Sequence, residues 1–108
     1  MQVHFTFRNV ESSEGIKNYA REKIAKMQKY LRTPLEADVV LVLERHLQRV
    51  ELSVRAEGER YAAAVDSEDM YASIDLVTDK VDRQIRDAKD AAKARVRSSG
   101  GVSQLSGK

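Results

Sequence analysis

The chain has 108 residues, of which 42% are hydrophobic and 33% charged, with a formal net charge of +2 and no cysteine. This length fits one compact domain, and the lack of cysteine excludes disulfide bonds, thiolate zinc sites and thiol catalysis. The longest apolar run, residues 39–43, is far too short to cross a bilayer, and the N-terminus lacks a signal-peptide pattern, so we expect a soluble cytoplasmic protein.

The first third of the sequence predicts a strand followed by a helix. Residues 2–8 alternate between apolar and polar side chains, which is typical of a half-buried strand. Ser13 and Glu14 then supply a hydroxyl N-cap and an acidic first turn, and apolar residues recur every three or four positions up to Leu31. Since the residue before Pro34 disfavours helical angles, we expect this helix over about residues 13–31.

The rest of the sequence predicts three strands and a second helix. Alternating segments lie at residues 37–44, 50–56 and 61–65, with a tight turn before the last and no turn signal around His46. A series of apolar residues from position 70 to position 96 predicts a helix of about 45 Å, which is longer than the strands and must extend past the sheet. We expect a domain over residues 1–97 and a flexible Gly/Ser-rich tail over residues 98–108.

This order of elements predicts an α+β fold. A helix that connects the first two strands makes those strands parallel, whereas the next strands form an antiparallel meander. Both helices can cover the same apolar face. We therefore predict a β-α-β-β-β-α two-layer domain, a four-stranded mixed sheet with both helices on one face.

The charges are segregated along the chain. Residues 17–32 carry six basic residues and one acidic residue, and residues 80–97 carry seven basic and three acidic residues, so the remainder is acidic. Basic helix surfaces usually serve only solubility, but such one-sidedness favours a polyanionic partner. RNA fits better than DNA read by sequence, because no recognition-helix arrangement is present and two helices can contact the phosphates of a shaped RNA.

Catalytic and metal-binding patterns are missing from the sequence. His4 and His46 lack a metal-ligand spacing, and the acidic cluster at residues 66–69 lacks the glycine and terminal glutamate of a calcium loop, so that helix capping explains it better. Neither a phosphate-binding glycine loop nor a nucleophilic serine motif occurs. We expect no enzymatic activity, no metal and no cofactor.

One group of motifs resembles a known family. The run Asp69-Met70-Tyr71-Ala72-Ser73-Ile74-Asp75, its continuation through Asp79-Lys80 and Arg83-Gln84, and the segments 9–11 and 23–26 are similar to the bacterial ribosome hibernation promoting factor family, which includes the ribosome-associated translation inhibitor. The resemblance covers residues 1 to about 95. It implies a protein that binds the small ribosomal subunit in the channel for mRNA and tRNA, blocks translation sterically, and preserves inactive ribosomes under stress or in stationary phase.

The charge pattern and the resemblance together indicate nine residues for binding to rRNA, namely Lys23, Lys26, Lys29, Arg32, Lys80, Arg83, Arg86, Lys89 and Lys93. Six of them match basic positions of the family, whereas Lys29, Arg32 and Arg86 follow from the charge pattern alone. Family members often have a Lys-His-Lys run where this chain has Asp87-Ala88-Lys89, which weakens phosphate attraction at that turn.

Two alternatives remain open at this stage. The long form of the family adds a C-terminal dimerisation domain, and the sequence fits either a native short form or a truncated long form, so ribosome dimerisation would need that domain or a separate protein. The second alternative is a protein-interaction module that uses the open sheet face, where Val40 and Val42 would lie near solvent. High β-propensity also explains these valines.

Overall fold

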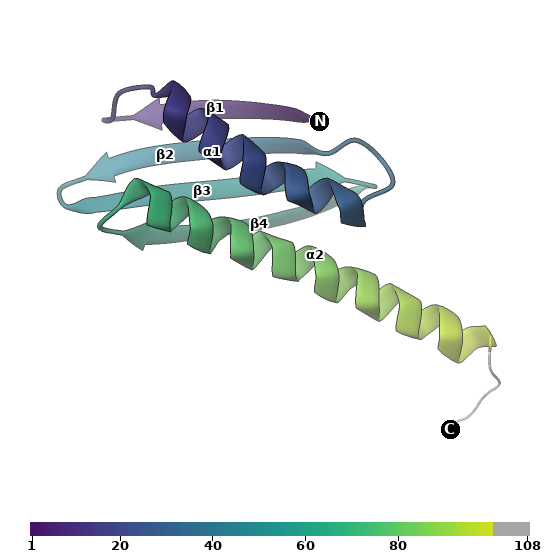
Figure 1. Cartoon of the computed structure of the whole chain (residues 1–108). Coiled ribbons are helices and arrows are strands. Elements are labelled where there is room, and N and C mark those ends of the chain that lie inside the picture. Colours follow the sequence, from purple (N-terminus) through teal and green to yellow (C-terminus); the bar gives the residue numbers. More distant parts are fainter. Residues whose placement is uncertain (101–108) are drawn as a thin grey trace.

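The computed structural model describes residues 1–100, and side chains up to residue 95. Its elements follow the predicted order: β1 (Gln2–Arg8), α1 (Glu14–Ala25), a short 3-10 helix η1 (Lys26–Tyr30), β2 (Glu36–Glu44), β3 (Leu47–Ala56), β4 (Glu59–Ser67) and α2 (Met70–Gly100). The strands lie in the order β1-β2-β3-β4, with β1 parallel to β2 and the other pairs antiparallel. Both helices cover one face of the sheet (Figure 1), so the predicted α+β architecture is confirmed.

The core lies between this sheet face and the two helices. Alternate residues of the central strands are fully buried, including Val39 and Leu41 of β2 and Leu52 of β3, as the period-two pattern predicts. The helices contribute buried side chains at helical spacing, among them Ile24 and Ile74. The phenylalanines of β1 are only partly buried because β1 is an edge strand.

The first helix differs from its prediction in geometry. The α-helix ends at Ala25, and the next five residues form η1 rather than the final turns of one helix. The Gln28 side chain within η1 binds the segment that follows, since its amide donates to the Thr33 carbonyl at 2.8 Å and accepts from the Leu35 N–H at 2.9 Å. These bonds hold the connection to β2 close to η1. With about three residues per turn, Lys26 and Lys29 lie on the same side of η1.

Two-residue turns join the last three strands. The register places Glu44 opposite Leu47 and Ala56 opposite Glu59, which leaves Arg45-His46 and Glu57-Gly58 as the turns. Both residues of the second turn have positive φ, at 56° and 76°, as a type I′ hairpin turn requires. In the first turn Arg45 adopts φ 55° without a glycine, which is why no turn signal could be recognised around His46.

The second helix begins after a side-chain cap and ends beyond the sheet. The Asp69 carboxylate accepts from the Ala72 N–H at 2.9 Å, as expected for an N-cap. The C-terminal half of α2 projects past the strands (Figure 1). It runs to Gly100, three residues beyond the expected domain boundary, and residues 101–108 of the expected tail lie outside the described residues. No helix within residues 1–100 is long and apolar enough to span a membrane.

A side chain of α2 also protects the exposed edge of β4. Gln84 accepts from the Ala62 N–H at 3.1 Å and donates to the Ala62 carbonyl at 2.8 Å, so it satisfies two backbone groups that face away from β3. Since both bonds are exposed, we expect Gln84→Ala to lower the free energy of unfolding by about 1 kcal/mol, or Tm by about 4–8 °C. Lys80→Ala, one turn earlier on the same flank, is the control. Equal melting temperatures for the two variants would contradict this role.

Candidate RNA-binding surface

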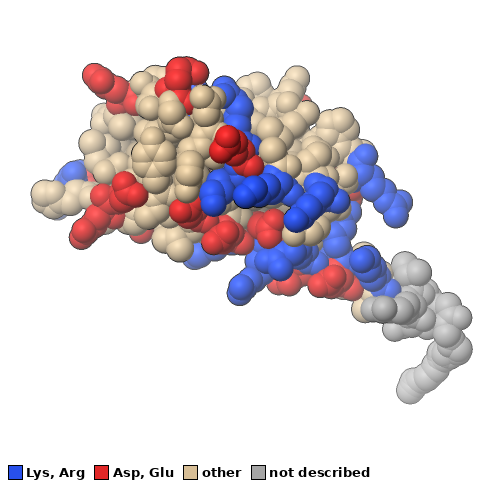
Figure 2. Space-filling model, in the orientation of Figure 1, with Lys and Arg blue, Asp and Glu red and all other residues tan. Residues whose placement is uncertain are grey.

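The nine predicted residues come from α1, η1, the segment after η1, and α2. Figure 2 views the molecule from the helix side and shows Lys and Arg gathered over the middle of this face and down the projecting part of α2, with acidic side chains among them. The two basic segments of the sequence are thus brought together, because α2 packs against both α1 and η1. We call the exposed surface formed by these nine residues the basic surface.

Six of the nine side chains make no ion pair or hydrogen bond with any side chain described in residues 1–95: Lys26, Lys29, Arg32, Lys80, Arg83 and Lys93. All six are exposed. The Lys29 ammonium lies 5.2 Å from the centre of the Tyr30 ring, a cation–π contact that leaves its charge available. These side chains can therefore contact an external anion without first losing a partner in the protein.

Three other predicted residues are already paired with acids. Lys23 lies 3.2 Å from Asp75, Arg86 lies 2.8 Å from Asp82, and Lys89 pairs with Glu57. Successive spacings of seven, four and three along α2 separate Asp75, Asp82, Arg86 and Lys89. These spacings place the four residues on one side of the helix, the side that faces α1 and η1. The positive charge on this side is therefore partly neutralised.

Lys80 is separated from the residues near α1. It precedes Gln84 by four positions and so lies on the same flank of α2. This flank faces the edge of β4, because Gln84 bonds to the backbone of Ala62 there. Arg83 is exposed on α2, and Arg32 is exposed just after η1, where its backbone N–H donates to the Glu57 carboxylate. The basic surface thus extends from η1 over α2 to the β4 flank.

Four side chains that join α1 to α2, Tyr19, Lys23, Tyr71 and Asp75, hold part of this surface in place, and we call this cluster the clasp. The Tyr19 hydroxyl donates to Asp75 Oδ1 at 2.6 Å, Lys23 pairs with the same carboxylate, and the Tyr71 ring packs edge-on against Tyr19 with centroids 5.0 Å apart. Asp75 and Tyr71 belong to the motif at residues 69–75, whose Met70 and Ile74 are buried in the core. The side chains of this motif therefore pack in the core and hold α2 against α1.

The clasp shifts the pKa values of its members. The pKa of Asp75 lies below its ordinary value of 3.8, mainly because the Tyr19 hydroxyl donates to the carboxylate, with a further lowering by Lys23 against the opposing effect of burial. The same hydrogen bond raises the pKa of Tyr19, and the bond to Asp75 raises the pKa of Lys23. The carboxylate is thus held in its charged form.

We expect Tyr19→Phe to lower Tm modestly at neutral pH and to lose this effect in acid. A carboxylate with a lowered native pKa stabilises the fold above its unfolded pKa, and this stabilisation disappears as the pH falls through the native value. The difference in Tm between wild type and Tyr19→Phe should therefore shrink below pH 3.8. Thermal unfolding from pH 7 to pH 2 measures it, and Tyr30→Phe is a matched control. A difference that stays constant with pH would contradict the clasp.

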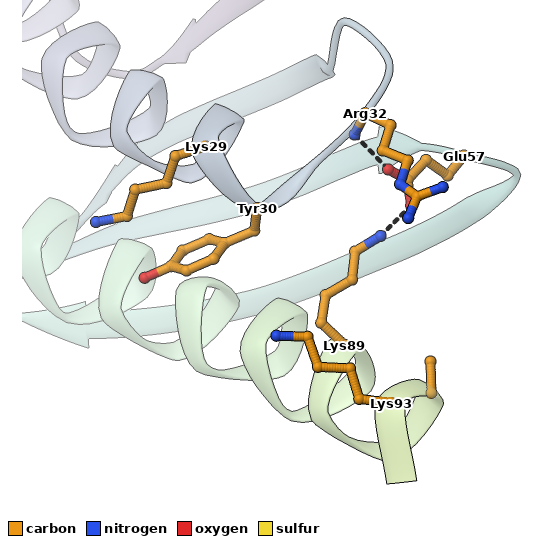
Figure 3. Close-up of a pocket in the computed structure, with 7 residues that line it drawn as sticks. Lys29, Tyr30, Arg32, Glu57, Lys89 and Lys93 are labelled. Atoms are coloured by element: carbon orange, nitrogen blue, oxygen red, sulfur yellow. Dashed lines mark hydrogen bonds and ion pairs between the residues drawn. The ribbon is translucent and has the colours of Figure 1, made fainter. Parts of the chain in front are cut away.

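A cleft lies where η1, the β3–β4 turn and α2 meet (Figure 3). It has a volume of about 780 Å³ and is lined by Lys29, Tyr30, Arg32, Glu57, Lys89, Ala92 and Lys93. Four of the nine predicted residues therefore converge here. Sequence reasoning missed Glu57 and Tyr30 as members of this site. The strand register could have indicated Glu57. Glu36, at the start of β2, pairs with Arg55 near the end of β3, and this pairing places the β3–β4 turn beside the end of η1.

The residues considered for other chemistry have structural surroundings. His4 and His46 are exposed. Asp66 pairs with Arg49 at 3.2 Å, and Asp69 caps α2. Within the described part of the chain, no three His, Cys, Asp or Glu side chains are placed to hold a metal ion.

Comparisons with known proteins agree with this architecture. A family model described as Sigma 54 modulation protein / S30EA ribosomal protein matches residues 3–93. The ribosome hibernation promoting factor of Pseudomonas putida is 32% identical over 83% of this chain and 88% of its own length, and that of Escherichia coli K12 is 32% identical over 86% and 98%.

Two solved structures are similar as well. The N-terminal domain of Thermus thermophilus Protein Y has a TM-score of 0.74 and 29% identity, covering 79% of this chain and 96% of that one. A ribosomal subunit interface protein from Coxiella burnetii shares the fold, with a TM-score of 0.72, 19% identity, and coverage of 83% and 99%. The chain thus belongs to the Sigma 54 modulation protein / S30EA ribosomal protein family, the family of the ribosome hibernation promoting factors.

Proposed function

We propose that this protein binds the small ribosomal subunit in the channel for mRNA and tRNA and inactivates the ribosome by occupying that channel. The observation that carries the proposal is the set of six exposed basic side chains on η1, the segment after it and α2 that have no ion-pair or hydrogen-bond partner among the described side chains. Phosphate contacts from Lys and Arg provide affinity and orientation without reading a sequence. The names of the related hibernation promoting factors support a ribosomal partner.

The shape of the molecule fits a steric mechanism. The domain measures 56 × 25 × 17 Å along its principal axes, because α2 extends well past the sheet. An elongated body with a projecting basic helix can enter a channel walled by RNA and exclude other ligands by its volume alone. No bond needs to be made or broken for this action. The nine residues of the basic surface are the proposed contacts to rRNA, and the proposed location is the cytoplasm, where ribosomes work.

Co-sedimentation with purified small subunits tests this proposal. Saturable binding should weaken steeply as salt rises from low to moderate concentration, since each phosphate contact releases about one counterion. Prior loading of mRNA and initiator tRNA should prevent binding, because the channel is then filled. Binding that is indifferent to these ligands would refute occupancy of the channel. Salt-insensitive binding to a protein partner would instead support use of the open sheet face.

Ribosome dimerisation is an activity separate from occupancy of the channel. The described residues form one domain whose basic surface is assigned to rRNA, and dimerisation would need a separate protein or a further domain. Sedimentation profiles of whole ribosomes with this chain alone should show inactive single ribosomes. Dimeric ribosomes in the same profile would show that this chain suffices.

A further inference from the structure

The cleft at the end of η1 contains one acidic side chain among four basic ones, within the part of the chain whose side chains are described. Glu57 lies at the tip of the β3–β4 turn, and Figure 3 shows its carboxylate pointing toward Arg32 and Lys89. Its side chain is only 22% exposed, although it belongs to a turn. A turn glutamate normally extends into water, so its position in a basic cleft needs an explanation.

Each oxygen of the Glu57 carboxylate has its own donor. Oε2 accepts from the backbone N–H of Arg32, and Oε1 accepts from the Lys89 ammonium. The pKa of Glu57 is lowered from its ordinary value of 4.5, mainly by the Arg32 N–H and then by Lys89, so the side chain is ionised at neutral pH. The backbone of Glu57 is also fixed, because its N–H donates to the Thr33 hydroxyl at 3.2 Å.

These donors are also the donors that bind phosphate. A main-chain N–H and a lysine ammonium converging on neighbouring oxygens are common contacts of phosphate groups in proteins. Lys29 and Lys93 line the same cleft and have no carboxylate partner among the described side chains. The cleft therefore holds more positive charge than one carboxylate neutralises, and its volume of about 780 Å³ admits a larger anion.

We propose that this cleft is a phosphate-binding site and that Glu57 occupies its donors in the free protein, so that an incoming phosphate displaces the Glu57 carboxylate. The inference rests on the proposed function for the source of the phosphate, which is the backbone of RNA. A free polyphosphate offers the same chemistry. Glu57 is then an internal competitor that lowers the affinity of the cleft for phosphate.

Glu57→Gln tests the competition because glutamine keeps the size of the side chain and removes its charge. The Glu57–Lys89 ion pair is only partly buried and contributes modestly, so we expect small-subunit binding to tighten about two- to fivefold. In the wild type, Lys89 gives up the Glu57 carboxylate when it binds phosphate, whereas in the variant it gives up an ion from solution. The slope of log affinity against log salt should therefore steepen by about one. Glu59→Gln is the matched control, since Glu59 is exposed in the same hairpin and its substitution changes the net charge equally. Equal affinities and slopes for the two variants would overturn the proposal.

NMR titration of the isolated protein separates this inference from the proposed function. Sodium pyrophosphate and a short single-stranded RNA serve as probes, and the backbone amide of Arg32 is the reporter. We expect both probes to shift this amide, at lower concentration in Glu57→Gln than in wild type. A shift with RNA alone would assign the site to RNA phosphate. No shift with either probe in Glu57→Gln would overturn the site. If the Arg32 amide shifts but no variant binds small subunits, the phosphate site is retained and the proposed function is refuted.

Discussion

Replacing Lys26 and Arg83 by glutamate together should abolish binding to the small ribosomal subunit while leaving the fold intact. Both side chains are exposed, and neither has an ion-pair or hydrogen-bond partner among the described side chains, so the substitutions break no such bond within the protein. Each reversal turns attraction to a nearby phosphate into repulsion of similar size. We expect the dissociation constant from the small subunit to rise at least about a hundredfold at low salt.

The control for this pair must change the net charge equally at another place. Arg45→Glu with Arg60→Glu does so, because Arg45 lies in the β2–β3 turn and Arg60 lines a groove on the open sheet face. Co-sedimentation measures binding, and circular dichroism with thermal unfolding establishes that both double variants are folded. Unchanged binding by the first pair, or equal loss by both pairs, would remove the basic surface from the proposed function.

The fold followed from the sequence because its signals are local. Period-two alternation placed Val39 and Leu41 on the buried face of β2, and the structure confirms that both are buried. The parallel pairing of β1 and β2 followed from the helix between them, and is confirmed by the register that sets Phe5 beside Val39. Each of these inferences depends on residues close together in the sequence.

The arrangement of the site could not be predicted in the same way. The pairing of Lys89 with Glu57 joins residues 32 positions apart, and it depends on where the β3–β4 turn meets α2. Counting charges in two segments predicted an excess of positive charge, but it did not show that Asp75 lies beside Lys23 and Asp82 beside Arg86 and that these acids neutralise part of that charge. The 3-10 geometry of η1, and the bonds from its Gln28 side chain to the backbone of Thr33 and Leu35, are not revealed by any periodicity.

The predicted contacts on the projecting half of α2 depend on one buried side chain. Ile85 is fully buried and is the last buried residue among the described side chains of α2. Between residues 86 and 95 only Lys89 and Ala92 are even partly buried. Arg86, Lys89 and Lys93 are therefore carried by a helical segment whose last buried side chain is Ile85, and beyond it Lys89 still contacts the domain through Glu57.

Ile85→Ala should lower the free energy of unfolding by about 2–5 kcal/mol, because it removes buried methyl groups and leaves a cavity. This is a large fraction of the stability of a small domain. We also expect the amides of residues 86–95 to exchange with solvent faster than those of α1, since their segment loses the last buried side chain that holds it to the domain. Denaturant titration and hydrogen exchange measure the two effects.

Leu76→Ala is the matched control for this substitution. Leu76 lies on the same helix but is 48% exposed, so its truncation should change the free energy of unfolding by less than about 1 kcal/mol. Equal losses in the two variants would show that helix propensity rather than burial determines the effect. If Ile85→Ala loses stability but residues 86–95 exchange no faster than α1, the projecting segment is held by contacts other than Ile85. If exchange there does increase, small-subunit affinity should fall with it, because the contacts of Arg86, Lys89 and Lys93 then require that segment to be ordered first.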